Sequence, residues 1–247
     1  IRFLGEPLTE KKIKRLRGHE IVLVPQSVSY LDPLMKIGDQ IQNGKKDVSV
    51  KEKCLGVLKR YGLAPDIRGK YPFQLSGGMT RRVLISTAVM EKPKLVIADE
   101  PTPGLHLEAA TRVMGHFREM ADDGAGVLLI THDLGVIAEM ADYVVVMYAG
   151  RVVEKGTAQE IFANPAHPYT IGLMASKPMV GKKVDKLYSI PGKVPNPINM
   201  PNYCYFKDRC EMCVEGCQGE YPHMIQLSPT HMVSCYRYYG KEDAQNG

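Results

Sequence analysis

Two adjacent carboxylates follow a short apolar run, and together they could support phosphoryl transfer. Asp99 and Glu100 come directly after residues 95–98, whose apolar side chains suit a buried strand. Hydrolysis of a nucleoside triphosphate needs one carboxylate to hold Mg²⁺ and a second group to position the attacking water. Asp99 fits the metal role and Glu100 the role of the base. An acidic pair taken alone is more often a solvated turn or a helix N-cap.

A glycine-rich segment precedes a stretch that is predicted to be helical. It contains Ser76, Gly77 and Gly78. Free backbone N–H groups, a hydroxyl and the positive end of a helix together form an anion site. The alternative interpretation is a glycine-rich turn with a serine N-cap, which is common.

Two more polar residues follow apolar runs. His132 comes shortly after the run 126–130, and Gln26 shortly after the run 21–24. A lone histidine at such a place is more often structural than catalytic, and a lone glutamine is usually a surface residue. The four signals, each at the end of a strand or helix, are not independent of one another, and chance co-occurrence in this order is very unlikely.

Five of the six cysteines lie close together near the C-terminus, at Cys204, Cys210, Cys213, Cys217 and Cys235. In a chain that is not exported, this clustering favours metal or redox chemistry over structural disulfides. Four thiolates can hold zinc or an iron–sulfur cluster. The alternative is a set of unligated buried thiols. Cys54 stands apart and is expected to be a small buried residue.

The elements that must position these residues alternate between strands and helices. Strands are predicted at 20–24, 94–98 and 126–130, helices at 49–62, 79–90, 107–120 and 133–140, and a hairpin at 143–147 and 151–154. This order predicts an α/β fold with a largely parallel sheet, whose ligand lies at the carboxyl ends of the strands. Prolines interrupt the pattern after about residue 176, so we expect a main domain at 1–176 and a separate extension at 177–247.

Composition narrows the class of protein further. The chain has 247 residues, 44% of them hydrophobic and 24% charged, as in an ordinary globular protein. The net charge of +5 is too small to indicate nucleic-acid binding. No apolar run is long enough to span a membrane, and there is no signal peptide. Because the first residue is Ile1, we expect the chain to be part of a longer protein.

The motifs and their order resemble the nucleotide-binding domain of ABC transporters, a P-loop NTPase-like α/β fold with a helical signature subdomain. In this resemblance Gln26 lies in the Q-loop and residues 75–78 form the signature. Residues 95–100 form Walker B, and His132 is the switch histidine. The resemblance covers nearly the whole chain, and it implies ATP and Mg²⁺ as cofactors.

The resemblance also implies a role for each residue. Asp99 would hold Mg²⁺ and Glu100 would polarise water. His132 would sense the γ-phosphate, and Gln26 would link Mg²⁺ and water to the permease contact. The signature segment would bind the γ-phosphate of ATP held mainly by a partner subunit. ATP would then be hydrolysed in a two-subunit sandwich.

Further motifs resemble the oligopeptide, dipeptide and nickel importer branch of this family. They are residues 24–26, residues 31–33, the segment 164–170 and the C-terminal cysteines, although the branch commonly has Asn where Asp32 stands. This branch implies a peripheral ATPase at the cytoplasmic face of the membrane. Its expected partners are a second, paralogous ATPase, two transmembrane permease subunits and an extracytoplasmic binding protein. The transported substrate, peptide or nickel, cannot be read from this subunit. ABC proteins of DNA repair or translation usually carry tandem cassettes or coiled-coil insertions, which are not apparent here.

Within the extension, the spacing of Cys204, Cys210, Cys217 and Cys235 resembles that of oligopeptide-type ATPases. A [4Fe–4S] cluster is the occupant which the resemblance implies, and zinc is the alternative. Cys213 is then supernumerary, although it forms a good metal-binding pair with Cys210. The expected role is structural, because the proline-rich extension has few apolar residues of its own.

The sequence departs from the family pattern at three places. It contains no G-x-x-x-x-G-K-[ST] phosphate-binding loop, which we expect upstream of Ile1. Without that loop the chain would bind ATP poorly, so an inactive remnant or a regulatory partner subunit is the alternative function. His106 stands where the family usually has Asp, which could alter coupling between ATP sites, and Arg81 stands where Gln is usual.

Overall fold

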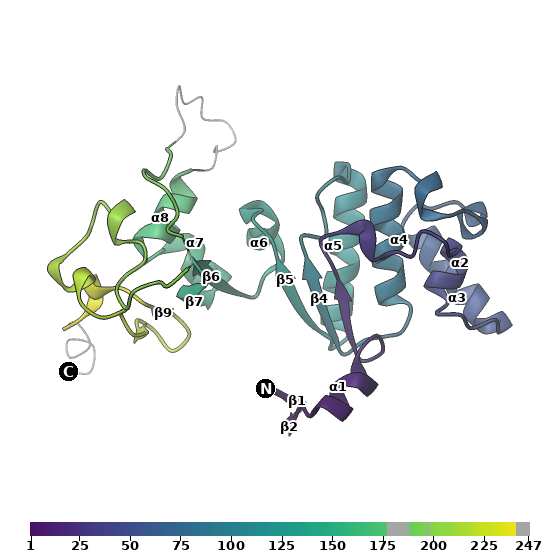
Figure 1. The fold of residues 1–247 in the computed structure, drawn as a ribbon, viewed down its shortest axis with the longest axis horizontal. Helices are drawn as coiled ribbons and strands as arrows, with labels where there is room; N and C mark the ends of the chain where they lie inside the picture. Colours follow the sequence, from purple (N-terminus) through teal and green to yellow (C-terminus); the bar gives the residue numbers. More distant parts are fainter. Residues whose placement is uncertain (177–187, 197, 241–247) are drawn as a thin grey trace. The chain divides into compact units, whose positions relative to one another are not determined.

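The computed structural model describes residues 1–176, 188–196 and 198–240, and its contacts divide the chain into two compact units after His132 (Figure 1). The predicted boundary between a main domain and an extension adjoins residues 177–187, which lie outside the described residues. That boundary stays a prediction. Each unit is considered below by itself.

The first unit is built on a parallel sheet of three strands. These are β3 (Ile21–Val24), β4 (Leu95–Asp99) and β5 (Gly126–Ile130), in the order β3-β4-β5. Val24 pairs with Ala98, and Asp99 pairs with Ile130. The carboxyl ends of all three strands therefore meet at one edge of the sheet, which confirms the predicted strands and their parallel arrangement.

Helices connect these strands, as parallel pairing requires. They are α2 (Ile37–Ile41), α3 (Val48–Arg60), α4 (Gly77–Val89) and α5 (Leu107–Asp122), with short 3₁₀ turns at Val28–Tyr30, Pro65–Gly69 and Pro72–Gln74. Figure 1 shows α4 and α5 beside the sheet. Val113 and Phe117 of α5 are buried, as predicted from their spacing, whereas Leu107 in the first turn is 84% exposed.

The sheet is covered unevenly in the described residues. Val24, Val96 and Ala98 are fully buried, but Leu23 is 50% exposed and Leu128 is 52% exposed. Strand β5, which we expected to be a buried strand, lies at an edge, and its side chains alternate between half-buried and exposed. The difference arises because alternate side chains of a strand point to opposite faces, and only one face of this sheet is packed.

A small hairpin and a helix precede this sheet. Strands β1 (Arg2–Phe3) and β2 (Glu6–Pro7) pair antiparallel, and helix α1 (Glu10–Leu16) follows. The connecting residues Leu4 and Gly5 both have positive φ, at 50° and 79°, as a two-residue hairpin turn requires.

The second unit contains a four-stranded antiparallel sheet in the order β6-β7-β9-β8. The strands are β6 (Tyr143–Tyr148), β7 (Arg151–Thr157), β8 (Ile225–Gln226) and β9 (Met232–Val233), and the helices are α6 (Leu134–Met140), α7 (Ala158–Ala163) and α8 (Pro168–Ala175). Three 3₁₀ turns occur at Lys207–Arg209, Glu215–Gln218 and Tyr236–Tyr238.

The predicted hairpin of β6 and β7 is confirmed, and a strand from the C-terminal segment pairs with it. Glu154 of β7 pairs with Val233 of β9, so a strand from the end of the chain extends the hairpin sheet. A second contact supports this pairing, since the Ser234 amide donates to the Val153 carbonyl at 2.8 Å. None of the helices in the described part of the chain is long and apolar enough to cross a bilayer.

Candidate functional site

Glu100 occupies the turn directly after β4 in a conformation that is unusual for a residue with a side chain. Its φ is 45°, in the left-handed region, and its backbone amide donates to the Ile130 carbonyl at 2.9 Å. Such a conformation costs about 1–3 kcal/mol and persists only where the surroundings enforce it. Backbone strain of this kind is concentrated at functional sites.

The carboxylate of Glu100 is held by the residues that follow β5. It accepts hydrogen bonds from the His132 amide at 3.0 Å and from the Thr131 hydroxyl at 3.2 Å, and it lies 2.7 Å from His132 Nδ1. The Glu100 side chain is 14% exposed and that of His132 is 83% exposed. The parallel strands thus bring these two predicted residues together, with the carboxylate fixed and the imidazole accessible to a ligand.

Asp99 is the last residue of β4 and is half-buried at the same edge. Beside it, the Arg81 side chain on α4 donates from Nη1 to the Pro25 carbonyl at 2.9 Å. Burial lowers the pKa of Arg81, and the charges of Asp99 and Glu100 act in the opposite direction. Arg82, the next residue, instead donates to the carbonyls of Tyr61 and Gly62.

The signature segment lies at the N-terminus of α4. Ser76 has the extended backbone of an N-cap, but its side chain makes no capping hydrogen bond, and both Ser76 and Gly77 are exposed. A Cβ on Gly77 would meet nothing within 4 Å, whereas one on Gly78 would lie 3.2 Å from the Gly104 carbonyl. The hydroxyl and the first helical amides are therefore open to an anion, and Gly78 permits close packing of the loop after Walker B.

His106 begins helix α5 in that same loop region. Its Nδ1 accepts a hydrogen bond from the Ala109 amide at 3.3 Å, which is the N-cap contact that an aspartate usually makes. His106, which stands in place of the family's usual Asp, thus caps α5 as Asp would. It does not bring the negative charge that Asp would add to this loop.

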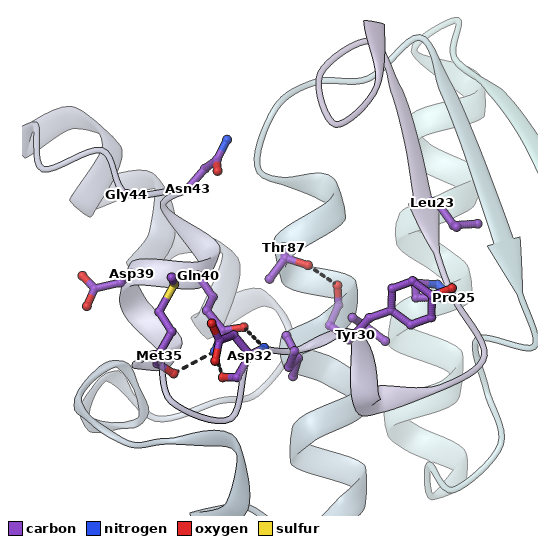
Figure 2. A pocket seen from close by; sticks show the side chains of 12 residues that line it. Leu23, Pro25, Tyr30, Asp32, Met35, Asp39, Gln40, Asn43, Gly44 and Thr87 are labelled. Carbon is purple, nitrogen blue, oxygen red and sulfur yellow. Dashed lines mark hydrogen bonds between the residues drawn. The ribbon is translucent and has the colours of Figure 1, made fainter. Parts of the chain in front are cut away.

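Gln26 lies two residues after the end of β3 and is exposed, and the preceding residue, Pro25, lines a cavity of about 560 Å³ (Figure 2). Figure 2 shows the loop after Gln26 on one side of this cavity and α2 on the other. The Gln40 side chain closes the loop, because it accepts from the Asp32 amide at 2.9 Å and donates to the Asp32 and Met35 carbonyls. Asp32 accepts from the Leu34 amide at 2.8 Å, a contact that the oxygen of the branch's usual Asn could also make.

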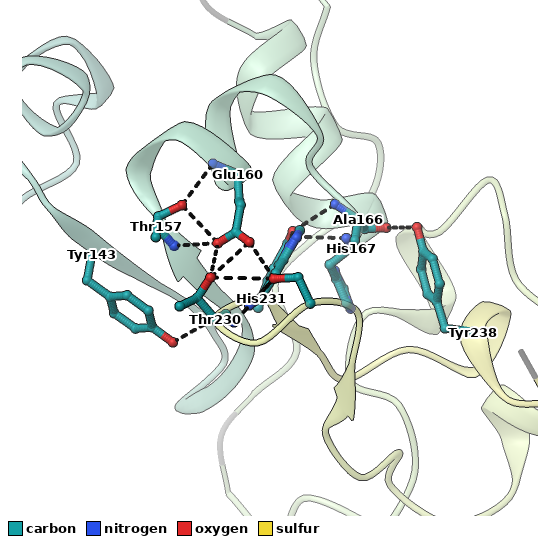
Figure 3. A network of polar contacts seen from close by, with 10 residues as sticks. Tyr143, Thr157, Glu160, Ala166, His167, Thr230, His231 and Tyr238 are labelled. Atoms are coloured by element: carbon teal, nitrogen blue, oxygen red, sulfur yellow. Dashed lines mark hydrogen bonds and ion pairs between the residues drawn. The ribbon is translucent and has the colours of Figure 1, made fainter. Parts of the chain in front are cut away.

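The segment 164–170 has a structural role in the second unit, shown in Figure 3. Its Ala166 and His167 amides donate to the two oxygens of Glu154, at 2.7 and 2.9 Å. The same carboxylate lies 2.7 Å from Nε2 of His231, and its side chain is fully buried. Glu154 of β7 therefore joins this motif to the loop that precedes β9.

His167 makes the second unit sensitive to acid. It is 2% exposed, and burial lowers its pKa from 6.5 to about 4. The unfolded chain binds a proton at His167 more readily than the folded protein does. Above about pH 6.5 neither state is protonated there, and the protein keeps its full stability. As the pH falls to about 4, up to about 3 kcal/mol of stability is lost. We expect His167→Asn to flatten the pH dependence of thermal unfolding over this interval, since Asn can still accept the Tyr169 amide that His167 Nδ1 accepts.

An exposed histidine provides the control for this prediction. His19→Asn should leave the pH profile unchanged, because that side chain is solvated in the folded protein. Equal pH profiles for wild-type and His167→Asn would contradict the prediction.

The five clustered cysteines are free thiols. Burial, together with the nearby thiols of Cys217, Cys235 and Cys210, raises the pKa of Cys204 to about 12. These four thiols are thus close enough to interact. Among the residues that the structure describes, however, no group of three or more His, Cys, Asp or Glu side chains is placed to hold a metal ion. The predicted [4Fe–4S] or zinc site is not confirmed and stays a prediction. Cys54 is buried, as expected.

The sequence did not reveal the contacts that three residues make in these sites. The contact of Arg81 with Pro25 joins positions 56 residues apart. Thr131 precedes His132 and would have been found by asking which neighbours could fix a catalytic carboxylate. Glu154 resembled any other charged residue of a hairpin strand. The sequence signal that could have drawn attention to Glu154 is its charged side chain within a predicted strand.

The fold and the site define a nucleotide-binding cassette. Solved cassettes have the same fold: the post-hydrolysis dimer of MJ0796 bound to ADP and Pi has a TM-score of 0.56 at 24% identity, covering 62% of this chain and 69% of that one. CbiO1 from Clostridium perfringens, part of the ABC transporter complex cbiONQ, has a TM-score of 0.55 at 28% identity. The match covers 66% of this chain and 67% of that one.

Sequence comparisons give the family. The ABC transporter model matches residues 1–103, and the model of the oligopeptide/dipeptide transporter C-terminal region matches residues 153–217. A putative peptide import ATP-binding protein of Brucella melitensis is 39% identical over 94% of this chain and 73% of its own length. The oligopeptide transport ATP-binding protein AppD of Bacillus subtilis is 37% identical over 93% of this chain and 73% of its own length. The dipeptide transport ATP-binding protein DppD of Lactococcus lactis is 38% identical over 93% of this chain and 69% of its own length.

The chain belongs to the ATP-binding proteins of ABC transporters, in the branch that carries the oligopeptide/dipeptide C-terminal region. This is a family of transport ATPases, as the motifs of the sequence predicted.

Proposed function

We propose that this chain is part of the ATPase subunit that drives import of peptides through a membrane permease. The observation that carries the proposal is the carboxylate of Glu100, which is held after β4 in a left-handed turn by contacts with His132 and Thr131. In addition, the relatives compared above are named as peptide import, oligopeptide and dipeptide transport proteins. Nickel is the alternative cargo.

The chemistry that we assign to the site divides between Asp99 and Glu100. Asp99 has the oxygen donor that Mg²⁺ prefers and would hold the ion, which when bound neutralises charge on the phosphates. Glu100 would accept hydrogen bonds from the attacking water and orient it. His132 contacts Glu100 through its amide and its ring, and the exposed ring would sense the γ-phosphate. Gln26, at the end of β3, would connect this site to the permease contact.

The signature segment would act on a second nucleotide. Ser76 and Gly77 are exposed, and the Ser76 side chain makes no capping bond, so the N-terminus of α4 can bind phosphate oxygens. We propose that this nucleotide is bound mainly by a paralogous ATPase subunit, in a two-subunit sandwich. Two permease subunits and an extracytoplasmic binding protein would complete the importer, with the ATPases at the cytoplasmic face.

We place the permease contact at the cavity beside Gln26. The loop that lines it carries exposed apolar side chains, including Tyr30 at 70% and Leu34 at 85% exposure. Exposed apolar groups around a concave surface favour protein–protein contact.

We also propose that a phosphate-binding loop preceding this sequence packs on the uncovered face of the first sheet. Leu23, Leu128 and Ile130 are about half exposed on that sheet, at 50%, 52% and 48%. Sequencing the coding DNA directly upstream of Ile1 tests this proposal. An in-frame G-x-x-x-x-G-K-[ST] supports a competent ATPase. A stop codon there supports the alternative of an inactive or regulatory partner subunit.

The function itself is tested with the intact protein in its membrane complex. ATP hydrolysis in proteoliposomes containing the permease should increase when peptide and the binding protein are supplied. Stimulation by nickel and not by peptide would reassign the cargo. Stable binding to a complete homologous ATPase, without nucleotide and without hydrolysis, would favour the regulatory alternative.

A second proposal concerns the cysteines. We propose that Cys204, Cys210, Cys217 and Cys235 bind a [4Fe–4S] cluster, with zinc as the alternative and Cys213 as a further donor. The spacing of these cysteines in the sequence supports this proposal. Metal analysis of anaerobically purified protein tests it. Iron and sulfide in a ratio of one would support the cluster, and zinc without iron would exclude it.

A further inference from the structure

A second cavity in the first unit, of about 610 Å³, lies at the amino ends of β4 and β5. Lys94, which directly precedes β4, and Ala125, which directly precedes β5, both line it. Because these strands are parallel, Glu100 and His132 follow them at the other edge of the sheet. A ligand in this cavity would therefore leave the nucleotide site open. The volume is in the range of cavities that bind small molecules.

Part of the cavity wall is apolar and carries no charge. Val89 and Pro93 line it and are buried. His116 on α5 also lines it, and its Nδ1 is hydrogen-bonded to the hydroxyl of Tyr61, a side chain that is 1% exposed. Burial lowers the pKa of His116, so its ring is neutral at pH 7. This wall can receive the apolar part of a ligand.

The charged groups of the lining have both signs. They are Arg60, Lys92, Lys94, Glu119 and Asp123. Arg60 and Glu119 form an ion pair with each other. The Lys94 ammonium is 2.7 Å from a carboxylate oxygen of Glu20, which lies outside the lining. With Glu20 included, positive and negative charges balance, so these surroundings do not favour a polyanion such as a nucleotide.

Lys92 and Asp123 have no ion-pair partner among the described residues that line this cavity. Lys92 follows α4, and Asp123 ends α5. They are too far apart to form an ion pair with each other, although both line the same cavity. A ligand that carries one charge of each sign at a distance can pair with both. The two termini of an extended dipeptide are about 7 Å apart, which suits this arrangement.

We propose that this cavity binds a short peptide by its free termini. Lys92 pairs with the peptide carboxylate and Asp123 with the peptide ammonium, while the apolar wall contacts the peptide side chains. A bound peptide thereby connects the end of the signature helix α4 to the end of α5. The biological meaning rests on the proposed function, because a peptide importer delivers this ligand to the side on which its ATPase lies. The cavity would then sense imported cargo.

The experiment is isothermal titration calorimetry of the intact purified protein with alanyl-alanine as the probe. Two further probes each lack one charge: alanyl-alanine amide has no carboxylate, and N-acetyl-alanyl-alanine has no ammonium. Each should bind wild-type about tenfold more weakly than alanyl-alanine, as expected for loss of one charged contact. A probe with both termini capped should bind more weakly still.

Two variants identify the groups on the protein. Lys92→Gln should weaken binding of alanyl-alanine about tenfold and leave binding of alanyl-alanine amide unchanged. Asp123→Asn should weaken binding of alanyl-alanine by a similar factor and leave binding of N-acetyl-alanyl-alanine unchanged. Lys51→Gln and Asp47→Asn are the matched controls, because both residues are exposed on α3 or at its start and neither lines the cavity. Both controls should bind all probes like wild-type.

The inference is overturned if Lys92→Gln and Asp123→Asn bind alanyl-alanine as tightly as wild-type, or if capping the termini does not weaken binding. Since the titration requires neither hydrolysis nor the permease, it is separate from the test of the proposed function. Binding with the expected charge dependence, in a protein whose hydrolysis responds to nickel and not to peptide, would leave this site standing and reject the proposed cargo.

Discussion

Glu100→Gln is expected to lower the rate of ATP hydrolysis by the intact protein by about a hundredfold to ten-thousandfold, the range for loss of a positioned general base. The amide is nearly isosteric: its oxygen can still accept the bond from the His132 amide, and its NH2 group can donate to the Thr131 hydroxyl. It cannot, however, accept a proton from water. Nucleotide affinity should therefore stay close to that of wild-type, and kcat should fall. Steady-state hydrolysis and equilibrium nucleotide binding, measured on the same preparation, separate these two effects.

Glu108→Gln is the control for this prediction. Glu108 is an exposed carboxylate in the first turn of α5, where it forms an ion pair with Arg112. Its replacement should leave hydrolysis near the wild-type rate. A Glu100→Gln protein that hydrolyses ATP within a fewfold of wild-type would show that another group positions the water.

Glu154→Ala is expected to destabilise the second unit by about 3–5 kcal/mol, as for removal of one partner from a buried charged network. The change leaves the Ala166 and His167 amides and the His231 ring without their acceptor in a dry environment. Thermal unfolding should shift to lower temperature. Hydrogen exchange at the Ala166 and His167 amides should accelerate, because these amides lose their bonds directly.

Glu139→Gln provides the comparison, since Glu139 is exposed on α6 in the same unit. It should change the stability by no more than about 0.5 kcal/mol, as is usual for surface substitutions. Slow exchange at both amides in Glu154→Ala would mean that the carboxylate contributes little to this network.

Much of the first unit could be predicted from the sequence because its signals are local. Strands β3, β4 and β5 can be predicted from their apolar runs, and helix α5 from the spacing of its apolar residues. The rule that ligands lie at the carboxyl ends of parallel strands then placed Glu100 and His132 together, and their contact at 2.7 Å confirms that placement. The assignment of nucleotide and metal roles to these residues came from resemblance and stays a prediction.

What escaped prediction depends on contacts between distant parts of the chain. No local pattern indicates that Glu154 and His231 meet, because the pairing of β7 with β9 is set by packing and not by a turn. The left-handed backbone of Glu100 is likewise enforced by the Ile130 carbonyl on the neighbouring strand. The geometry of the thiols also depends on the fold of the segment from 198 to 240, whose prolines and short turns carry little periodic signal.

The pairing of β9 with β7 has a consequence for biosynthesis. The hairpin strand at 151–157 acquires its second neighbour only when residues 232–233 have been made. Until then the hydrogen-bonding edge of β7 has no partner strand, and the carboxylate of Glu154 lacks its contact with His231 on the growing chain. Pairings between distant segments form slowly, and unpaired edges promote aggregation. A nascent chain that stalls before β9 should therefore depend on chaperones and be degraded readily, even though the residues from Gln26 to His132 have already been made.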